Sequence, residues 1–407
     1  MAKKRNIIVG QSGGPTSVIN SSLAGVYKNA IERGFDKVYG MLHGIQGLLD
    51  EQYIDLSTQI HSELDIELLK RTPSAFLGSC RFKLPENLSD SFYRVLFEKL
   101  ERLDIGYFFY IGGNDSMDTV SKLSRYAAQI KSPIRFIGIP KTIDNDLVLT
   151  DHTPGYGSAA RYVAASVREI ALDASVYQQK SVTIIEIMGR HAGWLTAASV
   201  LARKFENDNP VLIYLPESAF NTDTFIEDVK KALEHTSNLV VCVSEGINDG
   251  NGTFICELAS DVGVDTFGHK MLTGSGKYLE NLVKEKLGVK VRSIELNVNQ
   301  RCSSSMISAT DQEEAIQAGI SGVHFALDGI TGKMIAFHRT EGADYSINYV
   351  PEDVNLICNQ EKTVPPEWIT GNGSDIGQAF IDYALPLIQG IVNVPEENGL
   401  PKFAYRK

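Results

Sequence analysis

The sequence has few cysteines, no excess of positive charge and no long apolar run. Its five cysteines form no CxxC pair, which argues against a zinc site and suits free thiols in a reducing cytosol. The formal net charge of −11 argues against general binding to nucleic acids or anionic membranes. The start, MAKKRNIIVG, passes into a glycine-rich turn instead of the apolar core of a signal peptide, and no later run reaches the length of a membrane span. We therefore expect a cytoplasmic protein with no nucleic-acid or membrane partner, in which any anion site is a local cluster of cations.

Internal repeats and low-complexity segments are also absent, so the chain is neither a solenoid nor a disordered linker. Its 407 residues, 43% of them hydrophobic, are enough to bury one large core or two moderate ones. Two domains are the first expectation.

Short apolar runs alternate with longer amphipathic segments. Strands are predicted for RNIIVG, KVYGML, GYFFYIGG and IRFIGIP in the first half, and for SVTIIEIMG, VLIYLPE, NLVVCVSEG and VRSIELNV in the second. Helices are predicted over 21–34, 116–131 and 157–177, and over WLTAASVLARKF, TDTFIEDVKKALEHT and GSGKYLENLVKEKLG. Apolar strands separated by helices predict an α/β fold with parallel sheets covered on both faces. The proline-rich stretch 358–373 is predicted to be a surface connection before a last helix at about 374–390.

Ligands of such folds bind beyond the carboxyl ends of the strands, so the segments that follow the strands are the candidate site. The first strand leads into QSGGPTSVIN, in which Gly13 and Gly14 allow backbone amides to approach an anion. The later strands lead into GGNDSMD, PKTIDND and MGRHAG. Four loops at one rim therefore carry glycine, acid or cation.

Each loop also has a purely structural interpretation. PKTIDND suits a solvated turn, SGGP a tight connection between strand and helix, and GGNDS a helix start capped by Asp115 or Ser116. Neither GxGxxG nor GxxxxGK[ST] fits the first loop, so it is not a standard nucleotide motif. What favours a reaction site is the coincidence of all four loops.

The motifs GGP, FLGSCRF, IGGNDS, PKTIDND, EIMGRHAGW and NQR, in this order, resemble those of phosphofructokinases from about residue 6 to about residue 330. The resemblance implies two Rossmann-like three-layer domains with mainly parallel sheets and an active site in the cleft between them. Residues 1–157 with about 300–345 are expected to form the phosphoryl-donor domain. Residues 158–299 with about 346–407 are expected to form the fructose 6-phosphate domain.

The resemblance also implies catalytic roles, in a family that transfers a phosphoryl group to the 1-hydroxyl of fructose 6-phosphate. Asp144 matches the general base and Thr142 a substrate contact, while Asp146 matches a carboxylate that organises Mg²⁺ or the base. Arg81 and Arg190 match residues that neutralise the moving phosphoryl group, and losing such a group costs about 10²–10³ in rate.

The sugar phosphate has its own matching positions. These are Thr142, Met188, Gly189, Arg190, Glu245, Arg292 and Arg301. Arg292 and Arg301 match guanidinium groups that grip the 6-phosphate, and the family places the residue at Arg292 in the neighbouring subunit's site. A homo-oligomer, dimer or tetramer, is therefore expected. A second intersubunit arginine of ATP-using members falls on Ser181, beside Lys180, and neither residue receives a role.

The phosphoryl donor is indicated by two departures from the ATP-using pattern. Where those members read GGDG and PGTIDND, this chain has Asp115 and Lys141 at glycine positions. A carboxylate at the first position repels the α-phosphate region of ATP, and a cation at the second suits a short, highly charged donor. Both residues resemble the pyrophosphate-dependent branch of the family. The donor site is accordingly assigned to Gly13, Gly14, Asp115, Ser116 and Lys141.

Mg²⁺ is the expected cofactor, since pyrophosphate without a cation leaves much charge unscreened. Its candidate ligands are Asn114, Asp115 and Asp146, with Asn114 at a position where the pyrophosphate branch often has aspartate. Two alternatives stay open: an ATP-dependent enzyme of the same family, and a non-catalytic sugar-phosphate sensor or regulatory subunit. Intact Asp144, Arg81 and Arg190 argue against the sensor.

Overall fold

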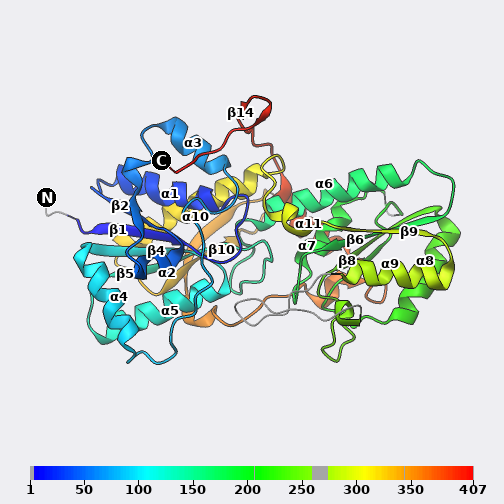
Figure 1. The fold of residues 1–407 in the computed structure, drawn as a ribbon, viewed down its shortest axis with the longest axis horizontal. Coiled ribbons are helices and arrows are strands. Elements are labelled where there is room, and N and C mark those ends of the chain that lie inside the picture. The colour runs from blue at the N-terminus through cyan, green and yellow to red at the C-terminus, as the bar shows by residue number, and fades with distance from the viewer. Residues whose placement is uncertain (1–3, 206, 259–273, 343, 407) are drawn as a thin grey trace.

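The computed structural model describes residues 4–205, 207–258, 274–342 and 344–406, which form two α/β lobes side by side (Figure 1). The first lobe is built on a seven-stranded sheet of order β11-β10-β5-β4-β1-β2-β3. Its strands are β1 (Asn6–Gln11), β2 (Val38–Met41), β3 (Tyr53–Asp55), β4 (Ile105–Gly112), β5 (Arg135–Pro140), β10 (Lys333–Arg339) and β11 (Ile347–Asp353). The two outermost strands pair antiparallel and the five inner strands pair parallel.

The second lobe has a four-stranded, wholly parallel sheet of order β7-β8-β6-β9. Its strands are β6 (Ser181–Ile187), β7 (Leu212–Tyr214), β8 (Asn238–Ser244) and β9 (Lys290–Glu295). β9 is an edge strand with most side chains partly exposed. The predicted fold class, two domains with mainly parallel sheets, is confirmed.

The central strands β1, β4 and β5 of the first lobe are buried on both faces of the sheet, as parallel sheets require. In β1, Ile7 and Val9 pack on one face and Ile8 on the other, which is the two-residue period of a strand. The helices of this lobe are α1 (Ile19–Glu32), α2 (Gly44–Leu49), α3 (Glu63–Arg71), α4 (Ser91–Arg102), α5 (Asn114–Gln129) and α10 (Ala309–Leu327). α1 and α10 lie in close contact, and Gly25 permits this because it has no side chain. A Cβ at that position would lie 2.2 Å from the carbonyl oxygen of Ile316.

The helices of the second lobe are α6 (Tyr156–Ala174), α7 (Trp194–Ala197), α8 (Thr222–His235) and α9 (Ser275–Leu287). The predicted helix over WLTAASVLARKF is shorter than expected, because α7 gives way to a 3₁₀ helix at Ala198–Ala202. The predicted last helix is reduced to α11 (Gln378–Ala384), followed by a 3₁₀ turn at Leu385–Ile388. Pro386 in that turn lacks the N–H that would continue an α-helix.

The expected domain boundary near residue 345 lies too early. β11 pairs with β10 in the first sheet, and Val354 and Ile357 pack into the core of the first lobe. Further along, Val364 and Phe380 pack into the core of the second lobe. The chain therefore crosses between the lobes within 358–363, the start of the predicted surface connection. No helix among the described residues is long and apolar enough to cross a membrane.

Candidate active site

Five strand-end loops from the two lobes meet in one cleft of about 680 Å³. The loops after β1, β4 and β5 contribute from the first lobe, and those after β6 and β8 from the second. Of the predicted site residues, the cleft is lined by Gly13, Gly14, Arg81, Asn114, Asp115, Ser116, Lys141, Thr142, Asp144, Asp146, Met188, Arg190, Glu245 and Arg301. The cleft therefore brings together residues that lie far apart in sequence.

The first loop is held in an extended turn that exposes backbone to the cleft. Gly13 has φ 76°, a left-handed conformation that favours glycine. Its N–H donates to the carbonyl oxygen of Cys80 at 3.2 Å, and Ser79 Oγ donates to the Gly13 carbonyl oxygen at 2.6 Å. A Cβ on Gly14 would lie 3.0 Å from Arg301 Nη1, so a side chain at this position would push the guanidinium away from the loop.

Lys141 is buried beneath this loop, with 3% of its surface exposed. Its Nζ donates to the Gly14 carbonyl oxygen at 2.5 Å. Burial lowers the pKa of Lys141 to about 8, while the nearby carboxylates of Asp144 and Asp146 act in the opposite direction. A cation is thus fixed at the floor of the cleft, directly below the glycine pair.

The second loop places its acidic residue in the first turn of α5, where a carboxylate is stabilised by the helix dipole. The carboxylate of Asp115 is partly exposed, 3.9 Å from Lys83 Nζ. Ser116 instead points inward, and its hydroxyl donates to Ser12 Oγ at 3.0 Å. The pair of hydroxyls ties the first loop to the second.

The third loop carries two carboxylates whose environment favours their protonated forms. The Asp144 side chain opens into the cleft, yet it lies deep enough that burial raises its pKa against the attraction of Lys141 and Arg190. Burial and the neighbouring charge of Asp144 raise the pKa of Asp146 to about 7. The Asp144 backbone N–H donates to Thr142 Oγ1 at 3.1 Å, which fixes the turn that presents the carboxylate.

The second lobe supplies the opposite wall of the cleft. Gly189 has φ 148°, and its N–H lies 3.4 Å from Glu245 Oε1. Burial raises the pKa of Glu245 to about 8, with Asp144 acting in the same direction. A Cβ on Gly246 would lie 1.8 Å from the carbonyl oxygen of Arg190, so glycine is required where this loop crosses the Arg190 backbone.

Two predicted sugar-phosphate residues, Gly189 and Arg292, are not among those that line the cleft, and Arg292 is the one that lies away from it. It lies on the edge strand β9, about 42% exposed, with Nη1 3.5 Å from Asp173 Oδ2. Exposed apolar side chains lie on and just beyond the C-terminal part of α6 beside it: Leu172, Val176 and Tyr177.

The stretch predicted as a surface connection also lines the cleft. Asn359 and Glu361 face the same space as Asp115 and Asp146. Asn114 holds this segment in place: its side chain donates to the Gln360 carbonyl oxygen and accepts the Asn359 N–H, both at 2.5 Å. The segment is the surface connection that the sequence predicts, and its first residues have the additional role of lining the cleft, which was not predicted.

His191 is a further lining residue, and its Nδ1 lies 3.1 Å from Glu361 Oε2. This contact joins the MGRHAG loop of the second lobe to the connecting segment. The sequence contains one indication that residues 359–361 reach the cleft. Asn114 stands where a carboxylate is frequent, and an amide both donates and accepts, which suits a contact with backbone.

The cleft suits a Mg²⁺ ion that enters bound to a phosphate substrate better than it suits an ion held by protein side chains alone. The described residues contain no cluster of three or more His, Cys, Asp or Glu side chains arranged to hold a metal. Asp146 Oδ1, however, is buried and has no hydrogen-bond partner among them. Mg²⁺ typically binds one or two carboxylates together with substrate phosphates, and Asp146 with Asp115 supplies that number.

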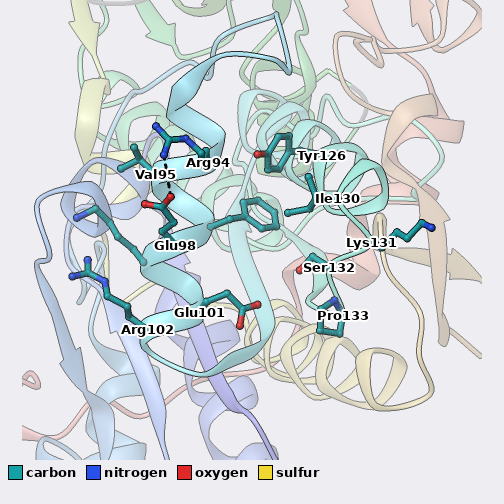
Figure 2. Close-up of a pocket in the computed structure, with 12 residues that line it drawn as sticks. Arg94, Val95, Glu98, Glu101, Arg102, Tyr126, Ile130, Lys131, Ser132 and Pro133 are labelled. Atoms are coloured by element: carbon teal, nitrogen blue, oxygen red, sulfur yellow. Dashed lines mark hydrogen bonds and ion pairs between the residues drawn. The ribbon is translucent and has the colours of Figure 1, made fainter.

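A second hollow, of about 900 Å³, lies on the outer side of the first lobe between α4 and the end of α5 (Figure 2). Three of its four cations are paired with acidic side chains: Arg94 with Glu98 at 3.3 Å, and Lys99 and Arg102 with Glu51. None of the strand-end loops reaches it. The cleft between the lobes is therefore the candidate active site.

Known proteins of similar sequence point to one family. The family model described as phosphofructokinase matches residues 6–326. The chain is 42% identical to the pyrophosphate–fructose 6-phosphate 1-phosphotransferase of Rhodospirillum rubrum, over 95% of this chain and 94% of that protein. It is 31% identical to the sulfofructose kinase of Alkalicoccus urumqiensis, over 96% of each.

Among solved structures, the pyrophosphate-dependent phosphofructokinase of Marinobacter aquaeolei superposes with a TM-score of 0.89. That protein is 38% identical in sequence, and the match covers 99% of this chain and 96% of the other. The similarity thus includes the segment beyond residue 326, which the family model does not match.

Proposed function

The chain belongs to the phosphofructokinase family, and from this premise we propose that it transfers a phosphoryl group from inorganic pyrophosphate to the 1-hydroxyl of D-fructose 6-phosphate, reversibly, giving fructose 1,6-bisphosphate and phosphate. The observation that carries the choice of donor is Lys141, buried under the glycine pair of the first loop, with Asp115 at the mouth of the same pocket. Full-length identity of 42% to an enzyme named for pyrophosphate supports the same choice.

In the reaction, the oxygen of the 1-hydroxyl forms a bond to the transferred phosphorus while the bridging P–O bond of pyrophosphate breaks. Asp144 accepts the hydroxyl proton, and its raised pKa brings it closer to the pH at which it works as a base. Thr142 Oγ1, 3.4 Å from Asp144 Oδ2, is placed to hold the hydroxyl or the base in line.

Charge stabilisation is the other contribution of the protein. Arg81 and Arg190 line the same cleft as Asp144, and we assign them to the oxygens of the moving phosphoryl group. Lys141 neutralises the donor. Mg²⁺, held by Asp115 and Asp146, would screen the charge of pyrophosphate; the amide oxygen of Asn114 stays a third candidate because it has a second lone pair.

Fructose 6-phosphate is assigned to the side of the cleft formed by the second lobe. We assign Met188 and Glu245, which line the cleft, to the sugar, with Gly189 beside them through its contact with Glu245, and Arg301 to the sugar's phosphate. We propose that Arg292 completes the phosphate site of a neighbouring copy, so that the protein works as a homo-oligomer, dimer or tetramer. Its exposed position on an edge strand, beside exposed Val176 and Tyr177, suits such a contact.

We place the protein in the cytoplasm and its reaction in glycolysis. All five cysteines are unpaired, as expected for a reducing compartment. The substrate and product belong to the sugar-phosphate chemistry of that route.

A donor comparison tests the proposal directly. Purified protein is assayed with fructose 6-phosphate and either pyrophosphate or ATP, at several Mg²⁺ concentrations. Turnover with pyrophosphate is expected, and turnover with ATP alone would overturn it in favour of the ATP-dependent alternative. Binding of fructose 6-phosphate without turnover of either donor would favour the sensor. A sulfofructose is also tested as the acceptor, and we expect no turnover with it. That result would distinguish the acceptor of this chain from the one named for its 31% identical relative.

A further inference from the structure

Asn145 stands between the proposed base Asp144 and the proposed metal ligand Asp146, and it has an unusual backbone. Its φ is 55°, in the left-handed region that asparagine adopts more readily than most residues. The residue is fully buried. Because the directions of its two neighbours depend on this backbone, whatever fixes Asn145 also fixes the two carboxylates.

The side chain of Asn145 is held at both ends. Its Oδ1 accepts the N–H of Thr153 at 3.1 Å, and its Nδ2 donates to Tyr383 Oη at 2.8 Å. The Tyr383 hydroxyl donates in turn to the carbonyl oxygen of Asp151 at 2.8 Å. The hydroxyl thus bridges the amide of Asn145 and the returning segment of the same loop, in a partly buried site.

Tyr383 itself has little freedom to move. Its ring lies 5.3 Å from Trp194 and 5.3 Å from Trp368, centroid to centroid. The Arg339 guanidinium lies 4.9 Å above the ring and donates to the Tyr383 carbonyl oxygen at 3.0 Å. Trp194 directly follows the MGRHAG loop, so Tyr383 packs between the loop that carries the carboxylates and the loop that faces the sugar.

We propose that Tyr383, on α11 and outside the residues 6–326 that the family model matches, is a positioning residue for phosphoryl transfer: through Asn145 its hydroxyl fixes the directions of Asp144 and Asp146. The segment after β11 is then part of the catalytic apparatus. The effect on phosphoryl transfer rests on the function proposed above. The hydrogen bond between Asn145 and Tyr383 does not depend on which phosphoryl donor the protein uses.

The test is a double-mutant cycle with Tyr383→Phe and Asn145→Gly. Phenylalanine keeps the ring packing and removes the hydroxyl, while glycine adopts positive φ without strain and removes the amide. Each single variant is expected to lower kcat about 10-fold or more, since small displacements of reacting groups slow the chemical step. The KM for pyrophosphate and the KM for fructose 6-phosphate should both stay within about twofold of wild type. The double variant should match the more impaired single variant. A wild-type kcat in Tyr383→Phe, or losses that multiply in the double variant, would overturn the proposal.

Tyr27→Phe is the matched control. Tyr27 is also buried, and its hydroxyl also donates to a backbone carbonyl, that of Ile60 at 3.4 Å, but it lies in α1 away from the cleft. Its kcat should equal that of wild type.

Hydrogen exchange across residues 142–150 gives a readout that needs no turnover. Exchange should quicken in Tyr383→Phe and not in Tyr27→Phe, and equal exchange in both would also refute the proposal. If wild type turned over no donor, the proposed function would fail while this measurement still decided the role of Tyr383.

Discussion

Lys141 Nζ donates a hydrogen bond to the carbonyl oxygen of Gly14 at 2.5 Å, so the cation of the third loop is fastened to the backbone of the first. A Cβ on Gly13 would lie 3.3 Å from the same nitrogen. The contact places one positive charge at a defined depth in the cleft. It suits a donor whose charge is concentrated in two phosphates better than a nucleotide, whose charge extends further.

Replacing Asp115 and Lys141 together by glycine is expected to change the donor. The double variant should lose about 100-fold or more in kcat/KM for pyrophosphate, because the buried cation that fits the donor is gone. It should gain measurable turnover with ATP, because the repelling carboxylate is gone as well. Kinetics with both donors check this. Full pyrophosphate activity in the double variant would show that the two residues do not set donor choice.

Asp144→Ser should abolish turnover with either donor. A general base contributes about 10²–10⁴ in rate, and serine does not accept the proton at neutral pH. Binding of fructose 6-phosphate, measured by calorimetry, should stay close to wild type, since the sugar-phosphate cations are untouched. Thr142→Val serves as a comparison that keeps the carboxylate, and it should retain more activity. Substantial turnover in Asp144→Ser would exclude Asp144 as the base.

The strand-end loops were predictable because local patterns specify them. Apolar strands that end in glycine pairs, as at Gly13 and Gly14, identify both the sheet edge and the approach of backbone to an anion. α10 was not predicted, because Asp311, Gln312 and Glu314 are buried on it and blur its apolar face. Asp311 is buried to accept the N–H groups of Gly155 and Ser158 at the start of α6, a contact that sequence periodicity does not show.

The contributions of the last third of the chain were hidden for a different reason. Tyr383 meets Asn145, and Asn359 meets Asn114, across more than 200 residues of sequence. Proline and glycine in 358–373 indicate a connection correctly, but local composition does not tell which surface a connection crosses. Only the packing of the two lobes brings it to the cleft.

Asn114→Ala is expected to release the segment that lines the donor side of the cleft. The substitution removes both hydrogen bonds to the backbone of Asn359 and Gln360. Hydrogen exchange over 358–363 should quicken, and the KM for pyrophosphate should rise several-fold as Glu361 loses its fixed place. Asn87→Ala is the control, because the Asn87 side chain accepts the N–H of Ser89 in its own loop, and it should leave both quantities unchanged. Unchanged exchange in Asn114→Ala would show that these two hydrogen bonds do not hold the segment in place.

His152 gives the protein a pH-dependent stability that can be measured. The ring is buried, with Nδ1 2.8 Å from Asp151 and Nε2 2.7 Å from Glu314. Burial opposes the charged form, but the two carboxylates outweigh it and raise the pKa to about 9. The unfolded value is about 6.5, so the folded state binds this proton more tightly. Its stabilisation, a few kcal/mol, is complete below about pH 6.5, declines as pH rises and is lost above about pH 9.

Urea denaturation of wild type and His152→Gln at several pH values checks this expectation. The free energy of unfolding of wild type should fall between about pH 6.5 and 9, and that part of the fall should be missing in the variant, because glutamine carries no titrating proton. His324→Gln is the matched control: its ring is exposed and lies 3.5 Å from Asp328, so its removal should leave the slope as in wild type. Parallel pH profiles for wild type and His152→Gln would show that the buried imidazole is not charged, and would assign the bonds to Asp151 and Glu314 to a neutral ring.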